Sequence, residues 1–146
     1  MKLRIAFVAV AAIWTVGVMQ SSARVAQEPA GRTVWDGVFT AEQAARGAAE
    51  YKTACSECHG NDLAGDGFAP ALSGGDFAGN WNELSVGDLF ERIRISMPPS
   101  GPSTVTPALK ADIVAHILNY NKYPAGKTEL EGKTEVLKLI KIEMKK

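Results

Sequence analysis

The two cysteines of this 146-residue chain lie in a single pentapeptide, Cys55-Ser56-Glu57-Cys58-His59, and this spacing constrains the fold more than any other feature. Two thiols three positions apart, with a histidine directly after the second, form the attachment signature of a c-type haem. In such a segment both thiols add across the porphyrin vinyl groups, and His59 binds the iron from the proximal side. The motif predicts one covalent haem c, which would help a small domain to fill its core.

Three other uses of the cysteine pair are weaker. A dithiol oxidoreductase lowers the pKa of one thiol and is built on a βαβ scaffold, but the sequence contains no βαβ pattern. A structural disulfide, which an exported protein would permit, leaves His59 without a role. A zinc site needs four ligands, and the only histidines are His59 and His116.

The N-terminal segment has the pattern of a secretory signal peptide. Lys2 and Arg4 precede an uncharged apolar run at residues 5–19, and small residues follow, with a cleavage position after Ala23. The run is shorter than the roughly 20 residues that span a bilayer as a helix. We therefore expect residues 1–23 to be removed on export to the periplasm; the alternative is an uncleaved membrane anchor.

The charge of the chain is balanced, with 16 basic and 16 acidic residues. Loss of the signal peptide would remove Lys2 and Arg4 and no acid, which leaves a slightly acidic mature chain. Such a balance does not favour nucleic acid or an anionic membrane surface as a partner. The length of the mature chain suits one small domain.

Capping signals predict two helices in the first part of the mature chain. Thr40 and Gln43 match a capping box, and the alanine-rich helix that follows should reach about Thr53. A second box, SVGD at residues 85–88, should begin a helix that ends near Ile95.

The remaining segments are predicted to be loops, one further helix and a tail. Residues 60–82 are rich in Gly, Asp, Ala and Asn and should form a long loop, as a segment that wraps a haem edge would. Residues 96–106 are proline-rich and should be extended. Thr106 caps a third helix that ends near Asn121. The apolar residues of the 130–146 tail fit either a short helix or a strand.

A haem iron held by His59 needs a second axial group or keeps an open site. The mature chain has only two methionines, Met97 and Met144. Met97 directly follows a predicted helix, and Pro98 and Pro99 would hold a weak iron–sulfur bond in place, whereas Met144 lies in the lysine-rich tail. We expect Met97 to be the distal ligand, which raises the reduction potential; the alternative is a methionine that fills core space.

The order of these features resembles a class I cytochrome c: an N-terminal helix, C-x-x-C-H, a haem-wrapping loop, a short helix, a distal methionine and a C-terminal helix. The resemblance covers residues 40–121. In that family a glycine and an aromatic residue precede the first haem cysteine at four-residue steps, as Gly47 and Tyr51 do here, and the glycine lets the first and last helices cross closely. The resemblance implies an all-α cytochrome c fold, with three to five helices packed around one covalently attached haem.

The resemblance also implies roles for residues around the haem. In the family a proline downstream of the ligand histidine offers its carbonyl to the imidazole N–H, and Pro70 matches that position, where it would fix the ring. Leu72, Leu89 and Ile93 are expected to line the haem, although any small core would use such residues. Trp81 has two interpretations, donation of its indole N–H to a haem propionate or simple packing.

One position departs from the family and two segments suggest a narrower likeness. His116 stands where the family commonly has an aromatic residue packed on the first helix, and we expect it to pack there rather than to bind iron. Residues 34–37 (VWDG) and 123–126 (YPAG) are similar to segments of cytochrome modules found with bacterial quinoprotein dehydrogenases.

The predicted function is electron transfer in a respiratory chain, without enzymatic activity. The family resemblance alone implies a quinoprotein dehydrogenase or a quinol-oxidising complex as donor and a terminal oxidase as acceptor. Two alternatives stay open: a haem sensor or small haem enzyme in which Met97 is displaceable, and a cytochrome subunit of a dehydrogenase complex. The expected organisation is a signal peptide at residues 1–23, a lead-in at 24–39, a cytochrome c domain at 40–123 and a C-terminal extension at 124–146.

Overall fold

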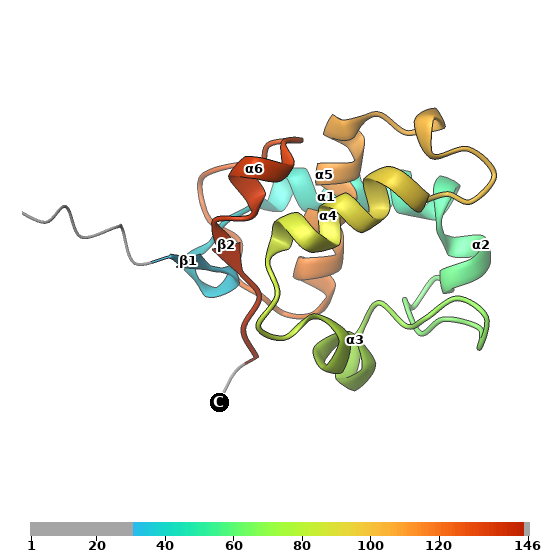
Figure 1. Cartoon of the computed structure of the whole chain (residues 1–146), viewed down its shortest axis with the longest axis horizontal. Helices are drawn as coiled ribbons and strands as arrows, with labels where there is room; N and C mark the ends of the chain where they lie inside the picture. The colour runs from blue at the N-terminus through green and yellow to red at the C-terminus, as the bar shows by residue number, and fades with distance from the viewer. Residues whose placement is uncertain (1–30, 145–146) are drawn as a thin grey trace, which may run out of the picture.

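The computed structural model describes residues 31–144, so the predicted signal peptide at residues 1–23 lies outside it. The described chain is mostly helical, as expected from the sequence (Figure 1). Its elements are, in chain order, β1 (Arg32–Thr33), a 3-10 turn (Val34–Asp36), α1 (Ala41–Ala54), α2 (Ser56–His59), α3 (Gly74–Trp81), α4 (Val86–Ser96), a 3-10 turn (Pro102–Thr104), α5 (Pro107–Tyr120), α6 (Thr134–Leu137) and β2 (Ile140–Lys141).

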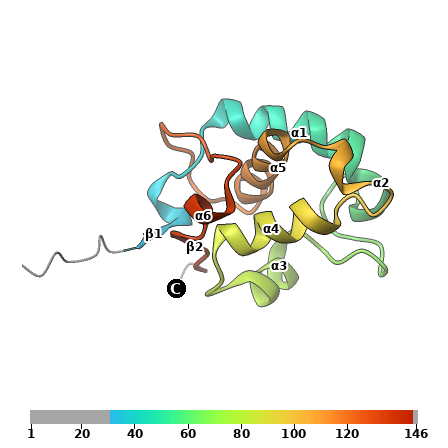
Figure 2. The ribbon, with the colours of Figure 1, turned by 45° about the horizontal axis from the view of Figure 1, so that its top comes forward.

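Helices α1 and α5 lie side by side, and both views of the ribbon show them as the central pair of the domain (Figures 1 and 2). Gly47 permits their close approach, because a Cβ at this position would overlap the main-chain carbonyl of Asp112 in α5. Tyr51, one turn later in α1, is buried. The close crossing that the sequence predicted at Gly47 is confirmed.

Helix α4 starts at the predicted capping box. The Ser85 hydroxyl accepts a hydrogen bond from the Asp88 amide at 3.0 Å, and the Asp88 carboxylate accepts one from the Ser85 amide at 3.0 Å. Leu89 and Phe90 then enter the core, where both are fully buried. This face of α4 packs toward α5, whose Ile117 is also buried.

Two segments that the sequence predicted to be irregular contain helical structure. Residues 74–81 form α3 inside the predicted loop, because Phe77 buries its ring in the core and fixes a helix that the glycine-rich sequence alone would not favour. Residues 102–104 form a 3-10 turn where extended chain was expected. Helix α3 thus forms where a tertiary contact overrides weak local propensity, whereas the turn is closed locally by the Thr104 amide and hydroxyl, which donate to the Gly101 carbonyl at 3.0 and 2.7 Å.

The predicted capping box of α1 is only half formed. The Thr40 hydroxyl accepts from the Gln43 amide at 3.1 Å, as expected. The Gln43 side chain, however, turns away from Thr40 and hydrogen bonds to the main chain of Leu130. The prediction for the Gln43 side chain was therefore wrong, because a buried main-chain partner far along the chain outcompetes the local cap.

The segment after α5 folds back onto the domain as a strap and contains both a helix, α6, and a strand, β2. Strand β2 pairs in parallel with β1, with Arg32 opposite Ile140. Ile140, Ile142 and Leu137 are buried in the same core as the other helices. The open question of helix or strand is resolved as one of each.

The paired strands lie at one end of the molecule and α2 lies at the other (Figure 1). The described chain both begins and ends beside this strand pair. Within residues 31–144, no helix combines the length and apolar character needed to cross a bilayer.

Candidate haem site

The C-x-x-C-H segment lies where α1 ends and α2 begins. Cys55 is the C-cap residue of α1, and its amide donates to the Tyr51 carbonyl at 2.9 Å. The His59 amide donates in turn to the Cys55 carbonyl at 3.0 Å, which closes the single turn of α2. Cys55 is half-buried and Cys58 is exposed, and no disulfide joins them. The turn thus holds both thiols and the imidazole in one compact segment.

The His59 ring is buried and its orientation is fixed by the main chain. Its Nδ1 lies 2.9 Å from the carbonyl oxygen of Pro70. Since a carbonyl only accepts, Nδ1 carries the proton and Nε2 keeps the lone pair that a metal needs. The hydrogen bond expected between these two residues is therefore present.

The loop that carries Pro70 is fastened at several points. The Gly65 amide donates to the His59 carbonyl at 2.9 Å, and the Leu72 amide donates to the Leu63 carbonyl at 2.8 Å. The Tyr51 hydroxyl donates to the Gly60 carbonyl at 2.8 Å, which ties the start of the loop to α1. These bonds make the Pro70 carbonyl a rigid acceptor for the imidazole.

The tip of the same loop is a polar turn with one apolar side chain. The Asp66 carboxylate accepts from the amides of Phe68 and Ala69, at 2.9 and 2.7 Å. These bonds, from Ala69 first and then Phe68, lower the pKa of Asp66. The Phe68 side chain is fully exposed beyond this turn.

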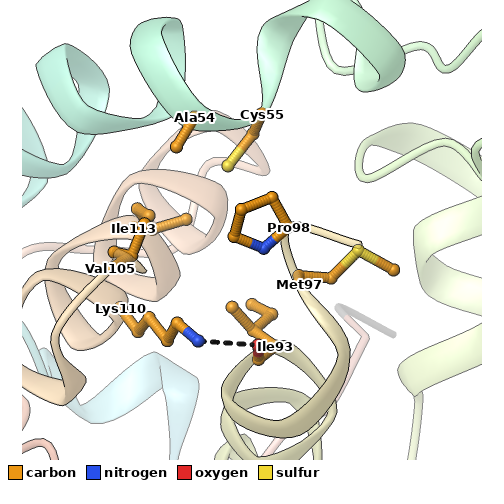
Figure 3. Close-up of a pocket in the computed structure, with 8 residues that line it drawn as sticks. All are labelled: Ala54, Cys55, Ile93, Met97, Pro98, Val105, Lys110 and Ile113. Atoms are coloured by element: carbon orange, nitrogen blue, oxygen red, sulfur yellow. Dashed lines mark hydrogen bonds between the residues drawn. The ribbon is translucent and has the colours of Figure 1, made fainter. Parts of the chain in front are cut away.

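Met97 directly follows α4, and its amide donates to the Ile93 carbonyl at 3.1 Å. It lines a small pocket together with Cys55, Ile93 and Pro98 (Figure 3). The Cys55 sulfur points toward the Pro98 ring in this view. The structure thus brings one predicted attachment cysteine and the predicted distal ligand to the same pocket.

Residues 42–117, just over half of the chain, match the sequence model of the family described as cytochrome c oxidase, cbb3-type, subunit III. The chain belongs to this family. It is therefore a c-type cytochrome that carries covalently attached haem c and works by haem-based electron transfer with redox protein partners. No curated protein and no solved structure matches the chain.

The residues of the cytochrome fit this cofactor. Haem iron in proteins takes imidazole nitrogen and thioether sulfur as axial ligands; His59 carries an imidazole and Met97 a thioether. Among residues 31–144 no group of three or more His, Cys, Asp and Glu side chains is placed to hold a metal ion, which leaves the zinc alternative without support.

The chemistry of Cys55 also disfavours the dithiol alternative. Burial, followed by the negative charge of Glu50, raises the pKa of the Cys55 thiol to about 11. A dithiol oxidoreductase needs the opposite shift, because the thiolate is its reactive form. The part of the chain that the structure describes contains no βαβ scaffold for such chemistry either.

The other residues expected around the haem are spread over the cytochrome. Leu89 is fully buried in the core, while Leu72, Trp81 and Ile93 are partly buried and pack against it. Only Ile93 among these four lines the pocket that contains Cys55 and Met97.

His116 lies on the α1–α5 contact, as expected. Its ring centroid is 5.2 Å from that of Tyr51 in α1 and 6.2 Å from that of Tyr120. Burial lowers the pKa of His116, which favours the neutral ring that packs between two aromatic side chains.

The sequence analysis missed Lys110, which is buried in α5 and lines the same pocket as Met97. Burial lowers its pKa. A signal was present: Lys110 lies at helical spacing from Ile113 and Ile117, so it falls on the apolar stripe of α5.

Proposed function

We propose that this cytochrome is a monohaem class I cytochrome c in which His59 and Met97 are the two axial ligands. The observation that carries the proposal is the hydrogen bond from His59 Nδ1 to the Pro70 carbonyl at 2.9 Å. It orients the buried imidazole and leaves Nε2 for iron, as the partner of a ligating histidine does. Cys55 and Cys58 are the attachment residues, and they form the only C-x-x-C-H motif of the chain.

The chain's own residues then act as a rigid mount for the cofactor. Haem c, when bound, supplies an iron that cycles between the ferric and ferrous states. The Pro70 carbonyl holds the His59 ring, and the Ile93 carbonyl holds the main chain of Met97. Since both mounts are fixed by the main chain, oxidation and reduction require little movement, which favours fast electron transfer over ligand or substrate chemistry.

We further propose that the cytochrome works in the periplasm, with residues 1–23 as its export signal. The proposed donors are a quinoprotein dehydrogenase or a quinol-oxidising complex. The proposed acceptor is a terminal oxidase, and the oxidase named in the family description supports this choice. Residues 40–123 form the proposed haem-binding domain, and residues 124–146 its C-terminal extension.

An optical redox titration of the mature holoprotein, produced with the c-type haem maturation machinery, tests the proposal. We expect one one-electron wave at positive potential and the far-red methionine-to-iron band in the ferric spectrum. Met97→Ala should abolish the band and lower the potential, and the control Met144→Ala should change neither. A wild-type protein without the band that binds carbon monoxide in the ferrous state would instead indicate a haem sensor or small haem enzyme.

A further inference from the structure

Lys110 is a buried lysine whose ammonium group is bound by main-chain carbonyls from both sides of Met97. Lys110 is only 2% exposed, although its side chain extends from α5 across the pocket toward α4 (Figure 3). Nζ donates to the carbonyls of Ile93 at 3.2 Å, Arg94 at 3.0 Å and Pro102 at 2.6 Å. An ammonium has three donors, so all three are used.

We propose that Lys110 is a positioning residue that holds the Met97 segment in its ligating geometry. The inference rests on the proposed function, because it presumes that Met97 is the distal ligand. Lys110 does not touch the iron in this proposal. It acts through the main chain on either side of the methionine.

The first side of the clamp is the end of α4. The Ile93 carbonyl accepts both the Lys110 ammonium and the amide of Met97 itself, at 3.2 and 3.1 Å. Lys110 therefore fixes the same acceptor that fixes Met97. The carbonyls at a helix C-terminus carry partial negative charge, which explains why a cation is stable there.

The second side of the clamp is the turn after Met97. The Gly101 amide donates to the Pro98 carbonyl at 3.0 Å. The carbonyl of Pro102, the residue after Gly101, accepts from the Lys110 ammonium at 2.6 Å. Residues 94–102, with Met97 between them, are thus closed into a loop whose two ends meet at one ammonium group. Without Lys110, the structure would leave three carbonyls at this loop with one donor fewer each.

The orientation of the side chains fits a supporting role rather than a competing one. In Figure 3 the Met97 thioether points away from Lys110, while the Lys110 ammonium points toward Ile93. Lys110 therefore holds the loop from behind and leaves the sulfur of Met97 directed to the other side.

The test compares Lys110→Met with Lys52→Met, an exposed lysine of α1, in the mature holoprotein. Lys110→Met keeps an unbranched side chain, one atom shorter, and removes its donors. We expect faster amide hydrogen exchange at Met97, loss of the far-red band at a lower temperature than loss of the helical circular dichroism, and about a tenfold or greater rise in the rate of carbon monoxide binding. Lys110→Arg should restore part of each property, because it keeps a cationic donor.

The outcomes separate the two proposals. If wild type has the far-red band and Lys110→Met matches wild type and Lys52→Met in all three readouts, the role of Lys110 is overturned while Met97 ligation stands. If wild type lacks the band, Met97 ligation fails and the role of Lys110 fails with it. If Lys110→Met yields no holoprotein, Lys110→Gln carries the test, because it removes the ammonium and is too short to reach all three carbonyls, and wild-type behaviour of its Met97 amide and far-red band would overturn the inference.

Discussion

The side-chain amide of Gln43 pairs with both main-chain polar groups of Leu130. Its Nε2 donates to the Leu130 carbonyl at 2.9 Å and its Oε1 accepts from the Leu130 amide at 2.8 Å. The two residues are 87 positions apart, and both are buried. This pair fastens the C-terminal extension to the first turn of α1.

Replacement of Gln43 by alanine should therefore destabilise the whole domain. The change leaves a buried N–H and a buried C=O of Leu130 without partners, and each such group costs about 1–3 kcal/mol. We expect the free energy of unfolding of the holoprotein to fall by about 3 kcal/mol in urea titrations followed by circular dichroism. The exposed neighbour Glu42 provides the control, since Glu42→Ala should stay within about 0.5 kcal/mol of wild type.

A Cβ at Gly47 should be tolerated poorly, because it would overlap the Asp112 carbonyl where α1 and α5 cross. The obstacle is main chain, so it cannot rotate away, and we expect Gly47→Ala to cost about 3 kcal/mol or more. Gly79 in α3 is the matched control. Apart from its sequence neighbours and the main chain of its own helix, no atom lies within 4 Å of the Cβ position there, so Gly79→Ala should be neutral or stabilise the helix by up to about 1 kcal/mol. Equal effects of both substitutions in thermal unfolding would contradict this account of the crossing.

The strap formed by the C-terminal extension should contribute to stability through a few buried residues. Ile142 is fully buried, so Ile142→Ala should lower the free energy of unfolding by about 2–5 kcal/mol. Leu139, three residues earlier, is 70% exposed, and Leu139→Ala should have little effect. If both variants unfold at the wild-type urea concentration, the strap does not support the domain.

Acid should weaken the attachment of α6 to α4 through Glu91. Its carboxylate accepts hydrogen bonds from Arg94 and from the Thr134 hydroxyl, which lower its pKa from 4.5 to about 2. Because the folded pKa lies below the ordinary value, this contribution is complete above about pH 4.5 and is lost as the pH falls toward 2.

Glu91→Gln should consequently reduce the loss of stability between neutral pH and about pH 3. The measurement is urea unfolding of the ferric holoprotein at a series of pH values, with Glu42→Gln as the exposed control. A slope with pH that is the same in wild type and Glu91→Gln would show that the Glu91 contacts contribute nothing.

The parts of the fold that the sequence predicted correctly depend on local chemistry. The C-x-x-C-H turn and the cap at Ser85 each reflect residues within one or two turns, whereas the close helix crossing at Gly47 was implied by the family resemblance. The fold class and the hydrogen bond between His59 and Pro70 were predicted from the resemblance to class I cytochromes c, which rests on the order of the motifs along the chain. Such locally determined caps and turns are found in the folded chain because the tertiary contacts around them are compatible with the same backbone conformation.

The parts that could not be predicted depend on partners distant in sequence. Helix α3 forms because the Phe77 side chain is buried in the core. The Gln43 side chain does not complete the capping box, because it hydrogen bonds to the buried main chain of Leu130 instead. Lys110 was overlooked because a lysine on an apolar stripe is usually taken as a solvated residue. Its carbonyl partners become visible only when the end of α4 and the loop after Met97 are brought together.

The pairing of β1 with β2 has a consequence for how this cytochrome meets other molecules. Both ends of the described chain leave the domain beside that strand pair, at the end opposite α2 and the exposed Cys58. A membrane anchor or a fused domain attached at either terminus would therefore be joined to the domain at the end that carries the β1–β2 pair. In the proposed haem site, the edge of the haem attached to Cys58 would then lie at the opposite end of the domain, accessible to partners within the reach of the tether.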